Sequence, residues 1–206
     1  QLDGVLQTNT TYYWRAGATN ACGTSSYTSW WSFTTTDAIT IMLVDDDDNQ
    51  PDMRDVYTIG HSTHSWETFF GLIKPYGIEV IVDVRSTPYS KMAQDFNREN
   101  LIELLVGEGI KYLFMGDQLG GRSNDPDCIS EGRVDYDSLS RSADFQEGFT
   151  RLLKGSKDYT IALMCSEKEP LICHRTILIS RYLIDASITV KHILGDGTLE
   201  EHNKSV

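Results

Sequence analysis

Residues 159–175 read YTIALMCSEKEPLICHR, and the architecture of the surrounding domain follows from them. An apolar run of strand length, Tyr159–Met164, ends at a cysteine; a polar segment follows, and a helical pattern begins near Cys173. A short apolar run bounded in this way is typical of a strand buried inside a sheet. The stretch therefore predicts a strand, a loop and a helix, with the reactive side chains in the loop.

The same alternation of strand and helix patterns continues on both sides of this stretch. Ser65 is a candidate N-cap before Trp66, Pro75 is a stop signal, and Ser142 caps a helix that closes at Gly155. Together the patterns predict an α/β fold: a three-layer, mostly parallel sheet of about five strands with helices on both faces, a Rossmann-like arrangement. Strands are predicted at 56–62, 78–84, 110–115, 159–164 and 188–194, and helices at 66–74, 98–106, 143–155 and 174–184.

Two segments of this part have no strong helix or strand pattern. Residues 123–140 are polar and rich in Asp and Ser, which predicts a long surface excursion or lid. Residues 195–206 are also polar and are predicted to form a short turn and a frayed end.

The first 36 residues differ in composition and residue pattern from the rest of the chain. Aromatic and small residues alternate from Tyr12 to Ala18, and a second strand pattern, Trp30–Thr35, comes after a turn rich in Gly, Ser and Thr. Two strands bury too little surface to fold alone. Residues 1–36 are therefore predicted to be a β-hairpin remnant.

This remnant resembles the last two strands of a fibronectin type III module. The resemblance implies the C-terminal fragment of a spacer or binding module of the kind found in exported bacterial proteins, and it assigns no site. The positions that carry it are Leu6, Thr10, Tyr12, Ala18–Asn20, Gly23 and Trp31–Thr35.

Residues 37–55 join the two regions. An apolar strand-like run is followed by the aspartates Asp45–Asp48, and a solvated acidic linker is the favoured interpretation. Acidic oxygens could also bind Ca²⁺ or Mg²⁺, although the spacing does not match an EF-hand loop. The predicted domains are thus 1–36, 37–55 and 56–206, and a fusion near Val56 explains their difference in character.

Composition narrows the functional classes. The net charge of -12 argues against non-specific nucleic-acid binding, which needs clustered Lys and Arg. Four scattered cysteines predict reduced thiols and a cytoplasmic location, or an exported one if the fibronectin-like fragment is genuine. No apolar run approaches the ~20 residues of a membrane span. Gln1 begins no signal-peptide pattern, which suggests a processed, truncated or excerpted chain.

Four polar clusters follow predicted strands of the α/β domain. In open α/β sheets, ligands bind at the carboxyl ends of the strands, near the point where the strand order reverses. The clusters should therefore converge on one edge of the sheet. They are Gly60–Ser62, Asp83–Pro88, Leu119–Arg122 and Cys165–Arg175.

Cys173 is the candidate nucleophile or redox thiol. A thiol at a helix N-terminus feels the positive end of the helix dipole, and neighbouring basic groups further favour the thiolate. His174 is a candidate base, but consecutive helix residues do not face one another, so His61 or His64 from another loop could serve instead. Cys165 is predicted to form the pocket wall.

The arginines predict an anionic ligand. Arg85, Arg122 and Arg175 each carry a guanidinium fork that suits phosphate or nucleotide oxygens. The expected partner is an anionic small molecule or nucleotide. A nucleic-acid end stays possible, and the sequence does not indicate the oligomeric state. The further ligand-binding candidates are Ser62, Cys165 and Glu167, the last of which could also orient a histidine.

A metal is the main competing interpretation of the cysteines. Two Cys and several His could make a tetrahedral zinc site, but the spacing of Cys165, Cys173 and His174, C-x7-C-H, matches no compact zinc motif. A redox pair of the two cysteines is a similar alternative. No metal ligand and no cofactor are therefore predicted.

Six ordered motifs resemble a bacterial and archaeal family, the domain-of-unknown-function family 488, from about residue 56 to residue 203. The resemblance implies a compact α/β domain with a Cys-His-Arg signature and no assigned reaction. One departure concerns the loop before Phe96, where Ala93, Gln94 and Asp95 stand in place of the usual nearby proline. The motifs are TIGHS (58–62), DVRSTPYS (83–90), FNRENL (96–101), GIKYLFMGDQLGGR (109–122), MCSEKEPLICHR (164–175) and VKHI (190–193).

Three functional hypotheses follow, and the sequence does not decide whether the chain is an enzyme. The first is an enzyme that uses Cys173 on an anionic substrate. The second is a non-catalytic module that binds a nucleotide or a nucleic-acid end in the same pocket. The third is an extracellular spacer or adhesion fragment whose relevant part is residues 1–36.

Overall fold

The computed structural model describes residues 11–14, 19–20, 23–24, 31–34, 54–123 and 125–202. The chain divides into two compact units, Gln1–Pro51 and Asp52–Val206. Residues 37–53, which include most of the predicted acidic linker, lie outside the described residues.

The first unit contains two short antiparallel pairs. Strand β1 (Thr11–Trp14) pairs with β4 (Trp31–Thr34), and β2 (Thr19–Asn20) pairs with β3 (Gly23–Thr24). Both strands predicted from the aromatic pattern are therefore present. The resemblance to a fibronectin type III module stays a prediction.

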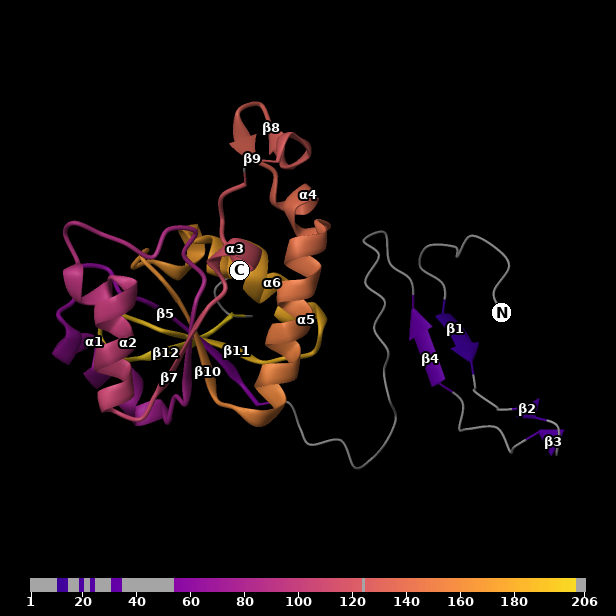
Figure 1. Cartoon of the computed structure of the whole chain (residues 1–206), viewed down its shortest axis with the longest axis horizontal. Helices are drawn as coiled ribbons and strands as arrows, with labels where there is room; N and C mark the ends of the chain where they lie inside the picture. The colour runs from indigo at the N-terminus through magenta and orange to yellow at the C-terminus, as the bar shows by residue number, and fades with distance from the viewer. Residues whose placement is uncertain are drawn as a thin grey trace. The chain divides into compact units, whose positions relative to one another are not determined.

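The second unit is an α/β domain built on a six-stranded sheet (Figure 1). The strand order is β12-β11-β5-β10-β6-β7; neighbours are parallel except β12, which is antiparallel to β11. A mostly parallel sheet is thus confirmed, and the finer Rossmann-like description stays a prediction. The strands are β5 (Val56–Gly60), β6 (Val80–Asp83), β7 (Lys111–Phe114), β10 (Ile161–Cys165), β11 (Val190–Ile193) and β12 (Leu199–Glu201).

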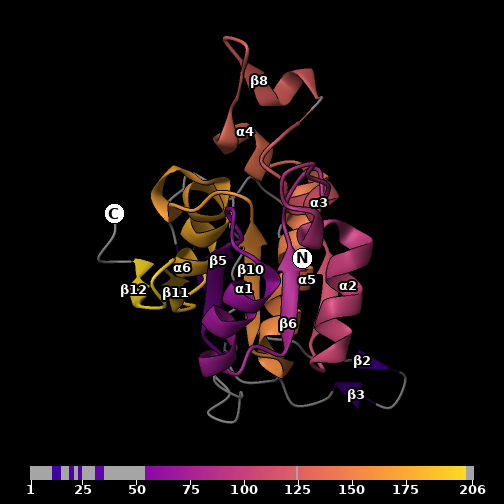
Figure 2. The same cartoon turned by 90° about the vertical axis from the view of Figure 1, so that its left-hand side faces the viewer.

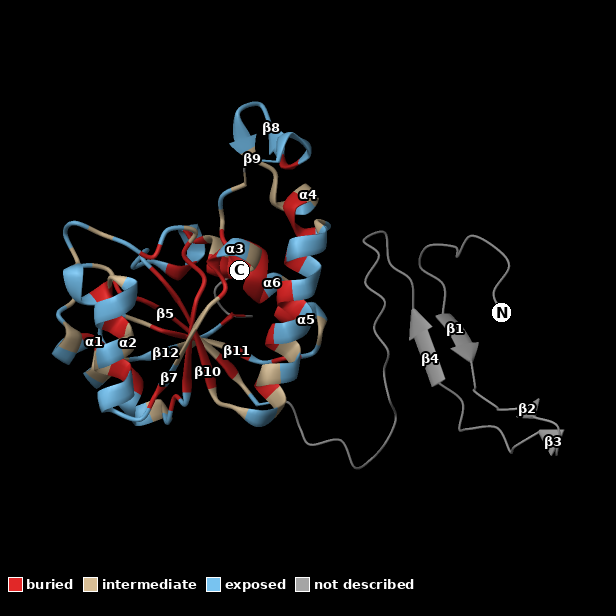
Figure 3. Ribbon diagram, in the orientation of Figure 1, coloured by how far each residue is buried: buried red, intermediate tan, exposed pale blue. Residues whose placement is uncertain are grey.

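Helices cover both faces of the sheet, and each face has its own apolar core (Figures 1 and 2). One face is covered by α1 (Trp66–Ile73) and α2 (Arg98–Gly107). The other is covered by α3 (Gly116–Leu119), α5 (Ala143–Asp158), the π-helical segment η5 (Arg175–Ser180) and α6 (Arg181–Asp185). Every residue of β6 and β10 is buried, as expected of strands covered on both faces (Figure 3).

The predicted helix starts rest on local hydrogen bonds. The Ser65 hydroxyl accepts from the Thr68 amide, and the Ser142 hydroxyl accepts from the Phe145 amide, so both serines cap their helices as expected. Pro75 lies in a short 3-10 turn, η1 (Lys74–Tyr76), that follows α1 and ends at Gly77 with φ 60°.

Two segments carry more structure than their sequence suggested. The excursion at 123–140 contains η3 (Pro126–Cys128), the hairpin β8 (Ile129–Ser130) and β9 (Arg133–Val134), and α4 (Tyr136–Ser140). Part of the expected frayed end is strand β12, which pairs with β11. Two further 3-10 turns are η2 (Gln94–Phe96) and η4 (Pro170–Ile172).

The strand order creates a reversal point at the centre of the sheet. After β5 the chain builds β6 and β7 on one side, returns to β10 beside β5, and then crosses to β11 on the other side. Cys165 at the end of β10 pairs in register with Gly60 at the end of β5. The polar loops that follow these strands therefore gather where ligands of open α/β sheets bind. Among the described residues, no helix is long and apolar enough to cross a membrane.

Candidate functional site

A pocket of about 260 Å³ lies at the carboxyl ends of β6 and β10. Ser86 and Thr87 come from the loop after β6, Tyr136 from α4, and Ile172 from the turn before Cys173. The sequence-predicted residues that line it are Arg85, Arg122, Cys165, Glu167, Cys173 and His174. His61, Ser62 and Arg175, also predicted, are not among the residues that line it.

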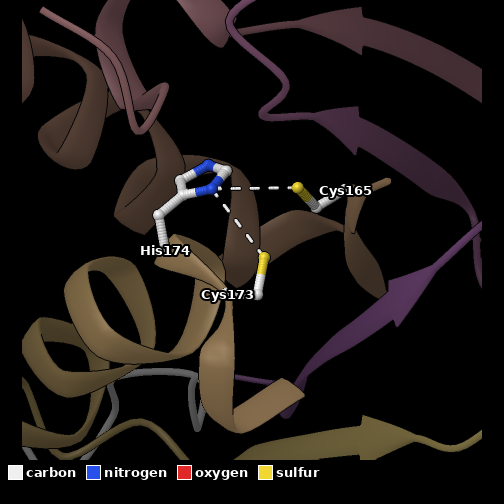
Figure 4. A group of neighbouring side chains, drawn as sticks. All are labelled: Cys165, Cys173 and His174. Atoms are coloured by element: carbon white, nitrogen blue, oxygen red, sulfur yellow. Dashed lines mark hydrogen bonds between the residues drawn. The ribbon is translucent and has the colours of Figure 1, made fainter. Parts of the chain in front are cut away.

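Two cysteines and a histidine form a cluster in this pocket (Figure 4). Nδ1 of His174 lies 3.7 Å from Sγ of Cys165 and 3.8 Å from Sγ of Cys173. The other ring nitrogen, Nε2, lies 2.9 Å from the carbonyl oxygen of Val84. Because a carbonyl only accepts, Nε2 carries the proton, and in the neutral ring Nδ1 turns its lone pair toward both sulfurs.

The pKa values of the two buried thiols are shifted in opposite directions. A hydrogen bond from Cys173, with a further contribution from His174, holds the pKa of Cys165 well below its ordinary value. The same interaction, with burial, raises the pKa of Cys173. The helix-dipole argument favoured Cys173 as the thiolate, whereas η5 begins only at Arg175, and it is the pKa of Cys165 that is lowered. Which sulfur reacts stays a prediction.

Arg85 is held by a buried ion pair. Its Nε and Nη2 donate to the two carboxylate oxygens of Asp83 at 2.9 and 2.6 Å, and Nη2 also donates to the carbonyl of Phe96 at 2.7 Å. Nη1 lies 3.1 Å from Nε2 of His61. Most of the guanidinium is thus committed to the protein, so Arg85 forms a fixed wall of the pocket.

His61 lies behind Arg85 and does not join the cysteines. Its Nδ1 donates to the carbonyl oxygen of Ser62 at 2.9 Å, and its Nε2 accepts from Arg85. Burial, together with the Arg85 charge, lowers the pKa of His61 to about 4. His61 is therefore a neutral support for Arg85, and His174 is the histidine that contacts the thiols.

Arg175 braces the loop between the two cysteines. It is fully buried, and its Nη1 and Nη2 donate to the carbonyls of Glu167 and Lys168 at 2.6 and 3.1 Å. Among the described residues no carboxylate forms a salt bridge with it. Arg175 therefore holds this loop from a buried position and does not itself line the pocket.

Two glycines allow close contacts between the loops around the pocket. A Cβ at Gly60 would lie 1.8 Å from the carbonyl oxygen of Glu167, and one at Gly121 would lie 2.7 Å from Cγ of His174. A glycine at each position is thus required by the contact between two loops.

The pocket also contains residues that were not named as candidate site residues. Ser86 and Thr87 belong to the cluster expected at this edge of the sheet, but no role was assigned to them. Tyr136 comes from the excursion, where no sequence pattern linked it to the pocket. The carbonyl of Val84, which orients His174, is a backbone group and leaves no trace in side-chain patterns.

One group of side chains among the described residues could hold a metal ion. The ligand atoms of Cys165, Cys173 and His174 all lie within 4.8 Å of one another. Thiolate and imidazole ligands suit Zn²⁺ and related soft or borderline ions.

Comparison with known proteins gives one family and no close relative. Searches of curated proteins and of solved structures found no match. Residues 65–182 match the family described as Domain of unknown function DUF488; the match runs from α1 to the first two residues of α6 and includes the cysteine cluster. Because this match spans more than half of the 206 residues, the chain belongs to the DUF488 family.

Proposed function

We propose that the α/β domain is an enzyme that binds an anionic substrate in the 260 Å³ pocket, with the cysteine–histidine cluster as its reactive group. One observation carries the proposal: Arg122 and the cluster line the same pocket. Arg122 is exposed, and its backbone amide is anchored by the hydroxyl of Ser86 at 3.1 Å. Its guanidinium can therefore meet a ligand without leaving a buried partner unpaired.

The surroundings of the pocket favour an anion. Arg175 places a buried positive charge beneath the loop, and the hydroxyls of Ser86, Thr87 and Ser166 offer donors along the wall. Charge-assisted hydrogen bonds of this kind are about twice as strong as neutral ones. In a protein with a net charge of -12, such a local positive site would be selective for its ligand.

A non-catalytic nucleotide-binding module is the second candidate. A neighbouring cavity of about 570 Å³ shares Ser86, Thr87 and Arg122 with the pocket, which leaves room for a ligand larger than phosphate. Binding alone predicts that Cys173→Ser keeps the affinity for a nucleotide and that Arg122→Gln loses it. An enzyme predicts that Cys173→Ser abolishes turnover.

Two alkylating reagents test anion recognition in the chelator-treated protein. Iodoacetate carries a carboxylate and iodoacetamide does not, while both lose iodide to the same thiolate. Peptide mass spectrometry gives the rate of each reagent at Cys165 and Cys173. The iodoacetate rate divided by the iodoacetamide rate should fall about tenfold in Arg122→Gln, as expected for loss of one charge-assisted hydrogen bond.

Arg133→Gln is the matched control, because Arg133 is exposed on β9 and does not line the pocket. Its ratio of rates should equal that of the unmodified sequence. An equal ratio in Arg122→Gln as well would remove the support for an anion site at this pocket.

A further inference from the structure

The distances within the cysteine cluster match those of a tetrahedral metal centre. Zn–S bonds of about 2.3 Å and Zn–N bonds of about 2.0–2.1 Å at tetrahedral angles separate a sulfur from a nitrogen ligand by about 3.6 Å. The two measured separations from Nδ1 of His174 are 3.7 Å to Cys165 and 3.8 Å to Cys173. Both sulfurs thus lie at a metal-ligand separation from Nδ1, and all three ligand atoms lie within 4.8 Å of one another.

Backbone groups contact each of the three ligands. The Glu167 amide interacts with the sulfur of Cys165, and the Arg175 amide interacts with the sulfur of Cys173. The Val84 carbonyl accepts from Nε2 of His174, which leaves Nδ1 free to coordinate. A metal-bound histidine usually has its second nitrogen held in this way.

The fold explains why the spacing of the ligands in the sequence does not match a compact zinc motif. The loop between the cysteines is closed by Arg175, which donates to the carbonyls of Glu167 and Lys168. Gly60 makes room for this loop, since a Cβ there would lie 1.8 Å from the Glu167 carbonyl oxygen. Tertiary contacts therefore bring together ligands that a local motif would hold by short spacing.

We propose that Cys165, Cys173 and His174 bind one Zn²⁺ ion, with the fourth coordination position open to the pocket. The inference rests on the proposed function, because it supplies the reactive group of the same pocket. Three protein ligands with an open fourth position are the arrangement of catalytic zinc sites. Zinc bound there would lower the pKa of a coordinated water or polarise a substrate oxygen.

Charge favours an anion in the open position. Two thiolates and one neutral imidazole balance the charge of Zn²⁺, so the centre itself is neutral. Buried Arg175, which forms no salt bridge among the described residues, adds one positive charge beside it. A single negative charge at the fourth position would then neutralise the site, in agreement with an anionic substrate.

Metal titration of the full chain tests the proposal. After removal of metal by a chelator, the protein should take up one equivalent of Zn²⁺, measured by elemental analysis after gel filtration. Co²⁺ in place of Zn²⁺ should give the visible bands of a tetrahedral ion and sulfur-to-cobalt charge transfer. Cys165→Ser, Cys173→Ser and His174→Gln should each weaken binding by more than about 100-fold, beyond the cost of losing an outer hydrogen bond.

Cys128→Ala is the matched control, because Cys128 is a buried free cysteine outside the cluster. It should retain one equivalent of Zn²⁺. If a ligand variant does not fold by circular dichroism, the original sequence still gives the answer: Zn²⁺ should protect Cys165 and Cys173, but not Cys128, from alkylation and should release protons. Failure of Zn²⁺ to protect those two thiols, or an octahedral Co²⁺ spectrum without charge transfer, overturns the proposal.

The outcome is separate from that of the anion test. If Zn²⁺ binds but Arg122→Gln leaves the ratio of alkylation rates unchanged, the metal site stands and anion recognition by Arg122 fails. If Zn²⁺ does not bind but the ratio falls, the anion pocket stands and its reactive group is a bare thiol.

Discussion

Gly121 packs against the ring of His174 so closely that a Cβ at Gly121 would lie 2.7 Å from Cγ and 2.8 Å from Cβ of the histidine. The Val84 carbonyl holds Nε2 of the same ring at 2.9 Å. The ring is therefore fixed by a hydrogen bond at one edge and by a glycine at its base, which is how Nδ1 comes to face both sulfurs.

Gly121→Ala should displace this ring and weaken the cysteine–histidine cluster. We expect a 10–100-fold loss of Zn²⁺ affinity, of the order seen when an outer partner of a metal ligand is removed. Gly71→Ala is the control: nothing lies within 4 Å of a Cβ there, and in helix α1 alanine should stabilise the fold by about 0.5–1 kcal/mol. Equal affinity in both variants would show that the glycine does not position His174.

Asp83→Ala should destabilise the domain by about 3–5 kcal/mol, because it leaves the buried guanidinium of Arg85 without its carboxylate. The side chains of this pair are 0% and 4% exposed. The exposed pair of Asp137 and Arg181 is the comparison, and Asp137→Ala should cost at most about 1 kcal/mol. Urea unfolding of both variants measures the difference, and similar losses would contradict the burial argument.

The parts of the fold that depend on local patterns were predictable from the sequence. Ser65 and Ser142 cap their helices as expected, and the continuous apolar run before Cys165 forms a strand buried on both faces. Strand β12 was missed because its residues are polar or half-exposed: it pairs at the edge of the sheet, so few side chains need to be apolar.

The sequence predicted where the candidate site lies in the fold, but not which partners its side chains contact. Polar residues after parallel strands must meet at one edge, which correctly brought Arg85, Arg122 and Cys165 to one pocket. The partners of each side chain depend on contacts between distant segments. His61 forms a hydrogen bond with Arg85, and Arg175 donates to backbone carbonyls. The spacing of these residues in the sequence does not distinguish such internal contacts from contacts to a ligand.

Residues 52–206 should fold without the first unit. Both apolar cores that cover the sheet are formed by residues of the second compact unit. The fragment should melt within about 2 °C of the α/β transition of the full chain, a shift that corresponds to less than about 1 kcal/mol. Calorimetry of the fragment and the full chain makes the comparison, and a larger decrease would show that residues 1–51 stabilise the domain.

His192 should make the stability of the domain depend on pH. The imidazole is buried, with Nδ1 2.8 Å from the hydroxyl of Thr58 and Nε2 3.1 Å from Nδ1 of His202. Burial, with the nearby His202 and Arg175, lowers the pKa of His192 to about 4 from 6.5. In the unfolded chain His192 is therefore protonated below about pH 6.5, whereas in the folded chain it is protonated only below about pH 4.

This contribution to stability is complete above pH 6.5 and is lost as the pH falls toward 4. Between pH 7 and pH 5, His192 should account for about 2 kcal/mol of the decrease in unfolding free energy. Glutamine at this position does not titrate. The decrease in unfolding free energy from pH 7 to pH 5, measured by urea unfolding, should therefore be smaller by about 2 kcal/mol in His192→Gln. Between pH 8 and pH 7 the two proteins should show the same change, because His192 is neutral in both states. Parallel pH profiles from pH 7 to pH 5 would mean that His192 is protonated in the folded protein, with His202 accepting its hydrogen bond.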